Sequence, residues 1–222
     1  MKIDRRPIDP ARLARLVALP PVLARAYAAR GIDDPSQLSH GLERLLPVGT
    51  LEGVDAAVAL LLEHRARGRL VLVVGDFDAD GATSSALIVR ALRAFGFPQV
   101  DFLVPNRFEY GYGLSPEIVA LAAQRAPGLI VTVDNGIAAR EALLRAQQLE
   151  MDVVVTDHHT LPAEHPPYLA LLHPACTPEG SPYRGLAGVG LAYVLAVALA
   201  KAVITPDTPA GLLAGLTATV PA

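Results

Sequence analysis

Short, mostly apolar runs alternate with longer helix-like stretches through most of the chain. The runs predicted to be strands cover residues 70–74, 100–104, 129–133, 152–156 and, more briefly, 169–172. Leu70-Val71-Leu72-Val73-Val74 and Val153-Val154-Val155 are apolar on both faces, which is typical of strands covered by helices on each side. The alternation therefore predicts an α/β fold, a doubly wound, mostly parallel sheet with helices on both faces.

The expected helices lie between these strands and also before them. In the sheet-forming part they cover residues 54–67, 83–95, 116–124, 138–149 and 186–202. Ahead of them, residues 10–29 carry apolar side chains at helical spacing, interrupted by Pro20-Pro21, and residues 31–35 break the pattern. We therefore expect a short helical N-terminal segment over residues 1–50 and an α/β domain over residues 51–222.

Polar clusters follow three of the predicted strands at their carboxyl ends. They are Asp76-Phe77-Asp78-Ala79-Asp80-Gly81, Thr132-Val133-Asp134-Asn135-Gly136 and Thr156-Asp157-His158-His159. Ligands of open parallel sheets bind outside this edge, so we expect the aspartates and histidines to lie together. Carboxylates and imidazoles gathered in this way bind divalent metal ions, and such sites commonly serve phosphate chemistry.

The first two clusters also have simpler explanations. Asp76, Asp78 and Asp80 alternate along an extended or turning segment, a pattern that an ordinary loop with a capping carboxylate also shows. Thr83-Ser84-Ser85 are candidate caps of the next helix. Asp134-Asn135-Gly136 is good turn chemistry, although a turn and a metal ligand are compatible there.

The third cluster is harder to explain by packing, because two adjacent histidines and an aspartate directly follow a buried strand. If His158 ligates a metal ion, its neighbour His159 points elsewhere and can contact phosphate or donate a proton to the leaving oxygen. Asp157 would then orient an imidazole. Three such clusters in matching sheet positions favour a metal site over three separate explanations.

The composition restricts the class of protein. Of 222 residues, 52% are hydrophobic and 18% charged, which favours a folded chain over a disordered one. The net charge of −3 argues against a globally basic surface but leaves a local basic groove open. The single cysteine, Cys176, excludes an intramolecular disulfide and suits a reducing compartment. Residues 1–15 lack an export signal, and the apolar stretch 186–200 is too short to span a membrane, so we expect a cytoplasmic protein without membrane contact.

The clusters resemble motifs of the DHH phosphoesterase superfamily. The matching segments are residues 75–83, 131–137 and 155–159 for its first three motifs, and further residues 103–115, 173–174 and 186–190. The segment around Arg107 favours the branch of bacterial exonucleases that degrade single-stranded DNA. The resemblance implies a metal-dependent phosphodiesterase that digests single-stranded DNA from 5′ to 3′ in DNA repair and recombination.

The resemblance also implies roles for individual residues. Two Mn²⁺ or Mg²⁺ ions would be held by Asp76, Asp78, Asp80, Asp134 and His158, with Asp134 bridging the ions. His159 and Asp157 would be the catalytic residues, with His159 facing the scissile phosphate. The nucleic acid would be bound by Arg107, Asn106 and Tyr112. Without the resemblance, a solvated loop charge is the favoured interpretation of Arg107, and Tyr110 and Tyr112 are as much packing residues as stacking partners of bases.

The chain departs from the family pattern at its end. The family carries a fourth acidic motif after the long apolar helix, but residues 215–222 contain no acidic residue and Asp207 is the last one. The DHH-associated and oligonucleotide-binding domains of the exonucleases are also absent from this sequence. We therefore expect a DHH domain that is incomplete at its C-terminal end, with a weakened second metal.

Three functional hypotheses stay open. The first is the exonuclease, with single-stranded DNA as substrate and single-strand-binding or other replication and repair proteins as partners. The second is a phosphodiesterase for oligonucleotides or cyclic dinucleotides. The third is a non-catalytic scaffold that keeps the fold and binds nucleic acid or a protein partner.

Overall fold

The computed structural model describes residues 6–39, 41 and 51–204. The chain divides into two compact units, Met1–Pro47 and Val48–Ala222. Each unit has hydrophobic side chains of its own that pack into a core.

In the described part of the first unit there are three short helices, each of which begins with a proline. Helix α1 covers Pro10–Arg15, α2 covers Pro21–Ala28 and the 3₁₀ helix η1 covers Pro35–Leu38. Proline favours the first helical position because its fixed backbone angle suits a helix and its missing N–H would have no partner there. The predicted helical N-terminal segment with a break at Pro20-Pro21 is confirmed.

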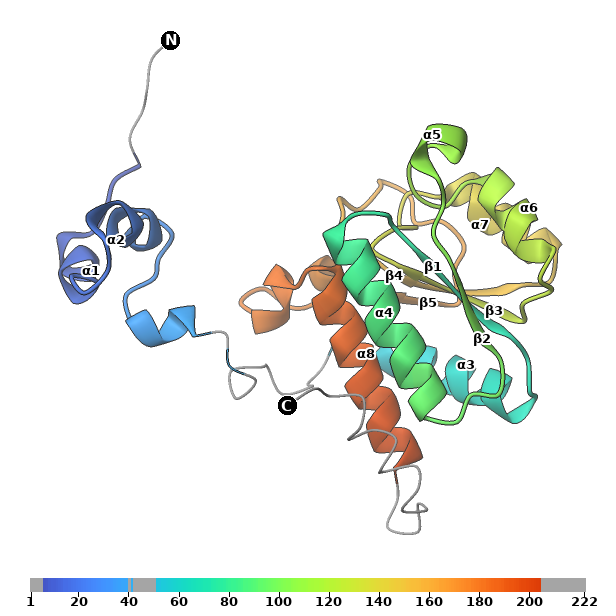
Figure 1. Ribbon diagram of the computed structural model, residues 1–222. Helices are drawn as coiled ribbons and strands as arrows, with labels where there is room; N and C mark the ends of the chain where they lie inside the picture. Colours follow the sequence, from blue (N-terminus) through green and yellow to red (C-terminus); the bar gives the residue numbers. More distant parts are fainter. Residues whose placement is uncertain (1–5, 40, 42–50, 205–222) are drawn as a thin grey trace. The chain divides into compact units, whose positions relative to one another are not determined.

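The second unit is built on a five-stranded sheet in which every neighbouring pair is parallel (Figure 1). The strands are β1 Val71–Gly75, β2 Val100–Leu103, β3 Leu129–Val133, β4 Asp152–Thr156 and β5 Ala170–Leu172, in the spatial order β2-β1-β3-β4-β5. In the register, Gly75 pairs with Val133, and Val133 pairs with Thr156. The three central strands therefore end level, and the residues that follow them emerge side by side.

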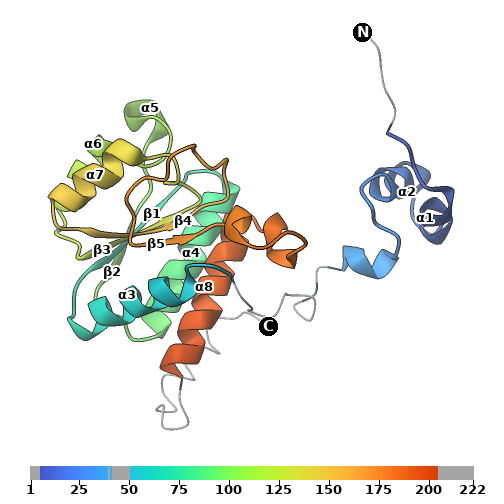
Figure 2. The same ribbon diagram turned by 180° about the vertical axis from the view of Figure 1, so that it is seen from behind.

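Helices cover both faces of this sheet (Figures 1 and 2). They are α3 Val54–Ala66, α4 Ala79–Ala94, α5 Arg107–Tyr110, α6 Pro116–Ala123, α7 Arg140–Gln148 and α8 Gly188–Val203, with 3₁₀ helices η3 Pro174–Cys176 and η4 Pro182–Gly185. Helices α3, α4 and α8 pack together on one face, and α6 packs with α7 on the other. The predicted doubly wound α/β fold is confirmed. Among the described residues, no helix is both long enough and apolar enough to cross a membrane.

The core under α6 and α7 shows why the strands are apolar on both faces. Leu72, Ile130 and Val155 of the sheet pack there against Ile118 of α6 and Leu143 of α7, and all are buried. The alternate strand residues, such as Val73 and Val131, are also fully buried. Since neither face reaches water, the strand pattern is a continuous apolar run.

Helix α4 begins four residues earlier than predicted, at Ala79 rather than Thr83. The Asp78 side chain caps it by accepting a hydrogen bond from Gly81 N at 3.0 Å. Asp80 consequently lies in the first turn of the helix, and the expectation of an extended or turning segment through Asp80 is wrong. The hydroxyl of Thr83 is not a cap either, because it donates back to the Ala79 carbonyl at 2.7 Å.

The core makes a direct prediction for stability. Replacing Ile130, which is fully buried at the centre of the sheet, by alanine should lower the free energy of unfolding by about 3 kcal/mol, through lost burial and a residual cavity. The control Leu169→Ala removes a side chain that is 55% exposed and should change it by less than about 0.5 kcal/mol. Urea denaturation measures both, and equal losses would contradict the burial argument.

Candidate metal centre

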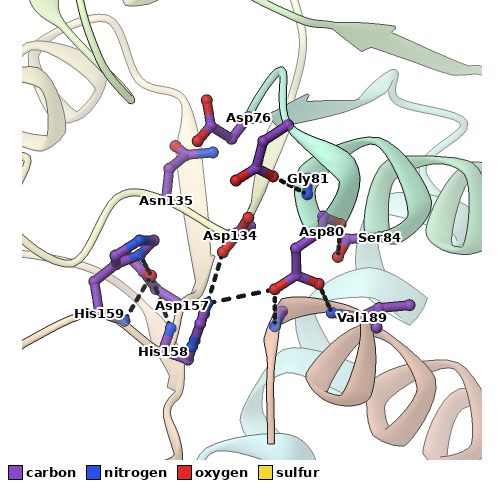
Figure 3. A network of polar contacts seen from close by, with 12 residues as sticks. Asp76, Asp80, Gly81, Ser84, Asp134, Asn135, Asp157, His158, His159 and Val189 are labelled. Carbon is purple, nitrogen blue, oxygen red and sulfur yellow. Dashed lines mark hydrogen bonds and ion pairs between the residues drawn. The ribbon is translucent and has the colours of Figure 1, made fainter.

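The three polar clusters meet at the carboxyl edge of the sheet. Asp76 follows β1, Asp134 follows β3 and Asp157 follows β4, where the level strand ends bring them together (Figure 3). Figure 3 also shows Asp80 reaching in from the first turn of α4. The predicted convergence of the clusters is therefore a property of the strand register.

Asp134 is the most constrained carboxylate of the centre. It is 1% exposed and has a left-handed backbone with φ 62°, a conformation that costs energy in residues other than glycine. The backbone is held there by the Asp134 N–H, which donates to the Thr156 carbonyl at 3.0 Å. Its Oδ1 atom is buried and lies 2.9 Å from His158 Nε2. An acceptor held in this way suits a cation.

Two groups of side chains bring candidate ligand atoms within 4.8 Å of one another. One is Asp76, Asp78 and Asp134, and the other is Asp134, His158 and His159. Asp134 belongs to both groups, so it occupies the position that a bridging ligand would have. Carboxylate oxygens with imidazole nitrogen form a donor set that Mn²⁺ accepts, and the oxygens alone suit Mg²⁺. The residues present therefore fit a divalent cation.

Asp80 is tied to the start of α8 as well as to this centre. Its two oxygens accept hydrogen bonds from the backbone N–H groups of Gly188 and Val189, both at 2.7 Å. The Oδ2 atom of Asp80, which accepts from Gly188 N, also lies 3.4 Å from His158 Nε2. Asp80 thus contacts the predicted ligand His158, but in the described part of the chain it lies outside both groups of clustered ligand atoms.

Gly188 allows this close approach. A Cβ atom at this position would lie 2.9 Å from the Cβ atom of Asp134 and 3.1 Å from Asp80 Oδ2. The first distance is shorter than real side chains tolerate, and both neighbours belong to the centre. Helix α8 therefore touches the carboxylates through bare backbone.

The two histidines turn in different directions, as adjacent residues in an extended segment do (Figure 3). His158 faces Asp134 and Asp80. His159 has other hydrogen-bond partners: its Nδ1 lies 2.7 Å from Asp157 Oδ1, and its Nε2 lies 2.9 Å from the Tyr112 hydroxyl, although one ring nitrogen stays within 4.8 Å of the ligand atoms of Asp134 and His158. One imidazole is directed at the metal ligands and the other is held by a carboxylate.

Asp157 organises this loop from inside the protein. It is 1% exposed, and its Oδ1 accepts hydrogen bonds from the backbone N–H of His158 at 2.7 Å and of His159 at 3.1 Å. Its Oδ2 accepts from Ile137 N at 2.9 Å. Because every contact holds backbone or His159, the geometry fits a residue that orients the imidazole rather than one that meets a substrate.

The segment after β2 places Arg107 above the centre. Its guanidinium lies 3.8 Å from the ring centre of Phe77 and 4.9 Å from that of Tyr112, and 3.5 Å from Asp76 Oδ2. The rings stabilise the cation over their faces. Asn106, also expected to bind phosphate, uses its side-chain oxygen to cap α5 by accepting from Phe108 N at 3.1 Å.

Several contributors to this site were missed by sequence reasoning. They are Phe77, which stacks on Arg107, and the N–H groups of Gly188 and Val189. Phe77 offered a signal, because an aromatic residue between two aspartates after a buried strand is forced toward the surface. The segment 186–190 was among the motif matches, but no local pattern pairs its amides with Asp80, which lies more than a hundred positions away.

Burial and charge shift the pKa values of the centre. Burial, then the neighbouring Asp80 charge, raise the pKa of Asp134 to about 6. Burial and the charge of Asp76 raise the pKa of Tyr112 to about 12. Burial alone would lower the pKa of His159, but the hydrogen bond and charge of Asp157 outweigh it and raise that pKa. Crowded carboxylates that resist ionisation are relieved by a bound cation.

Comparison with known proteins identifies the family. The sequence profile of the DHH family, N-terminal domain, matches residues 70–218. The chain belongs to the DHH family. It is 46% identical over 204 residues to the single-stranded-DNA-specific exonuclease RecJ of Escherichia coli, covering 90% of this chain and 34% of that protein. RecJ of Thermus thermophilus is 40% identical over 81% of this chain and 26% of its own length. The chain thus spans about a third of the length of the curated relatives it matches first.

Solved structures agree with this assignment. The crystal structure of exonuclease RecJ bound to manganese is 37% identical and superposes with a TM-score of 0.66, covering 79% of this chain and 45% of that one. RecJ from Thermus thermophilus in complex with Mn²⁺ is 34% identical with a TM-score of 0.65, covering 90% of this chain and 29% of that one. The sequence departs from the family's fourth acidic motif at residues 215–222, which lie outside the described residues.

The raised pKa of Asp134 predicts how metal binding depends on pH. A cation binds the deprotonated carboxylate, which is the main form above about pH 6 and is lost below it. The affinity for Mn²⁺ should therefore fall roughly tenfold between about pH 7 and pH 5 from Asp134 alone. Isothermal titration calorimetry measures this, and an affinity independent of pH would contradict it.

Gly188 gives a test of the close approach. Gly188→Ala should weaken Mn²⁺ binding by about tenfold or more, because the new methyl group displaces Asp134. Gly185→Ala is the matched control, since a Cβ there meets no atom within 4 Å. Equal Mn²⁺ affinity in both variants, measured on folded protein, would contradict the role of bare backbone at α8.

Proposed function

We propose that the chain is the catalytic part of a metal-dependent phosphodiesterase that degrades single-stranded DNA from the 5′ end in DNA repair and recombination. One observation carries the proposal: Asp76, Asp78 and Asp134 converge within 4.8 Å, with His158 directed at Asp134. The RecJ relatives are named as single-stranded-DNA-specific exonucleases, which supports this substrate. Residues 51–222 would be the DHH domain, and residues 1–50 a helical segment before it.

The metal ligands of the proposal are Asp76, Asp78, Asp134 and His158, with Asp80 as a further ligand. They would hold Mn²⁺ or Mg²⁺, the ions bound in similar RecJ crystal structures. The ions supply charge stabilisation at the phosphorus centre and a water that loses its proton readily. Asp80 keeps α8 against the site, which fixes the position of His158 through the contact at 3.4 Å.

The remaining residues act on the phosphate and its surroundings. His159 would face the scissile phosphate, with its ring held by Asp157 through Nδ1 and its Nε2 directed outward. This arrangement fits a group that donates a hydrogen bond or a proton to an oxygen of the phosphate. To reach the phosphate, His159 Nε2 must exchange its present partner, the Tyr112 hydroxyl, for substrate.

Arg107 would bind the DNA backbone. Its planar guanidinium matches phosphate oxygens, and the rings of Phe77 and Tyr112 keep it over the carboxylate cluster. Tyr112 is half exposed and would also stack on a base. Asn106 would act by capping α5, and thereby by holding Arg107 in place.

The partners and the location belong to the proposal as well. Single-strand-binding proteins and other replication or repair proteins would deliver the DNA. A cytoplasmic location rests on the single free cysteine, which suits a reducing compartment.

The test is an exonuclease assay with Mn²⁺ on a 5′-phosphorylated single-stranded oligonucleotide. Asp134→Ala should lower the rate by at least roughly a hundredfold, because it removes the shared candidate ligand. The control Asp101→Ala removes a carboxylate that pairs with Arg125 on the edge strand and should keep the rate.

The outcomes separate the hypotheses. No Mn²⁺ binding by the wild-type chain, or binding unchanged in Asp134→Ala, would overturn the metal site. Mn²⁺ binding without cleavage of any strand would overturn the enzyme and favour a scaffold. Cleavage of cyclic dinucleotides or very short oligonucleotides alone would favour the small-substrate phosphodiesterase.

A further inference from the structure

A pocket adjoins the metal centre on the side of the two histidines. It has a volume of about 540 Å³ and is lined by His158, His159, Thr160, His173 and the segment Arg184–Leu186, among others. None of the residues that line it carries a carboxylate, in contrast to the cluster of aspartates that His158 also faces. Its permanent charge is the guanidinium of Arg184, which stays protonated at any pH relevant to proteins.

Arg184 is held in place by the backbone of the turn beside it. Its Nε donates to the Thr177 carbonyl and its Nη2 to the Ala175 carbonyl, both at 3.3 Å. A guanidinium has five N–H donors in a rigid fork, so most of the donors of Arg184 are not used by these two bonds. Anchored in this way, the cation loses little freedom when it binds an anion.

We propose that this pocket binds a phosphate group of a nucleotide, with Arg184 as the binding cation. A planar fork of N–H donors matches two oxygens of a phosphate, and such charge-assisted pairs are among the strong hydrogen bonds of proteins. The volume falls within the range of roughly 300–1,000 Å³ that ligand pockets have. The nucleotide identity of the ligand rests on the proposed function, because the pocket shares His159 with the proposed site of cleavage.

Two sources carry this chemistry. One is the 5′-mononucleotide that an exonuclease releases, and the other is a phosphate within the strand next to the one being cut. Both place a phosphomonoester or a phosphodiester beside His159. The pocket would in either case keep the strand or its product in line with the metal centre.

The experiment is a titration of the metal-free full chain with thymidine 5′-monophosphate, followed by calorimetry or by NMR. Arg184→Gln should weaken binding roughly tenfold, the effect of losing one charge-assisted pair. Arg93→Gln is the matched control, because Arg93, in the last turn of α4, also donates to a backbone carbonyl, that of Val100 at 3.2 Å, and this contact lies at the amino end of β2. Unchanged affinity in Arg184→Gln, or equal binding of thymidine without phosphate, would overturn the proposal.

A second pair of variants leaves the bonds of Arg184 intact. A Cβ atom at Gly185 meets nothing within 4 Å, so Gly185→Asp adds a negative charge to the pocket wall without a clash. It should weaken the binding of thymidine 5′-monophosphate about as much as Arg184→Gln, whereas Gly185→Ala should not change it. Equal affinity of the two Gly185 variants would count against an anion site.

An oligothymidylate with a 5′-hydroxyl end distinguishes the sources. If it binds with the same dependence on Arg184, the pocket takes a phosphate of the strand; if only the mononucleotide does, the pocket takes the product. Because no metal or turnover is involved, the outcome is independent of catalysis. If the chain cuts DNA but Arg184→Gln leaves mononucleotide binding unchanged, only the phosphate-binding pocket is overturned. If mononucleotide binding depends on Arg184 but the chain does not cut DNA, only the proposed enzyme activity is overturned.

Discussion

Repulsion between carboxylates is the constraint on which the site depends. Asp76, Asp78 and Asp134 lie within reach of a single cation. Asp80 lies near them, because the Nε2 atom of His158 contacts both Asp80 and Asp134. Burial and, after it, the neighbouring Asp80 charge raise the pKa of Asp134 to about 6. Backbone N–H groups offset part of the repulsion: Gly81 N donates to Asp78, and Gly188 N and Val189 N donate to Asp80. A divalent cation would offset the rest.

The sheet brings these charges together and the helices hold them there. The level ends of β1, β3 and β4 fix Asp76, Asp134 and Asp157 as neighbours, and the buried apolar strands make that register costly to change. The strained backbone of Asp134 and the bare backbone of Gly188 then allow α8 to close on the cluster. Fold and site are coupled through these few backbone positions.

Much of this was predictable from local patterns. The bounds of β3 and β4 were predicted correctly because both strands are apolar runs between turn residues. His158 and His159 have different partners, Asp134 and Asp157, as their adjacency suggested. The start of α4 was not predicted, because the caps were expected at Thr83-Ser84-Ser85, whereas Asp78 is the capping residue. The contacts of Asp80 with α8 and of Arg107 with Phe77 join distant segments, and no local pattern encodes them.

The most direct test of the account is anomalous diffraction from crystals of the chain soaked in Mn²⁺, recorded at the manganese absorption edge. The account predicts a peak among the side-chain oxygens of Asp76, Asp78 and Asp134, within coordination distance of at least two of them, and adjacent to His158. A peak elsewhere on the protein, or none at this edge of the sheet, would contradict a metal centre built from these residues.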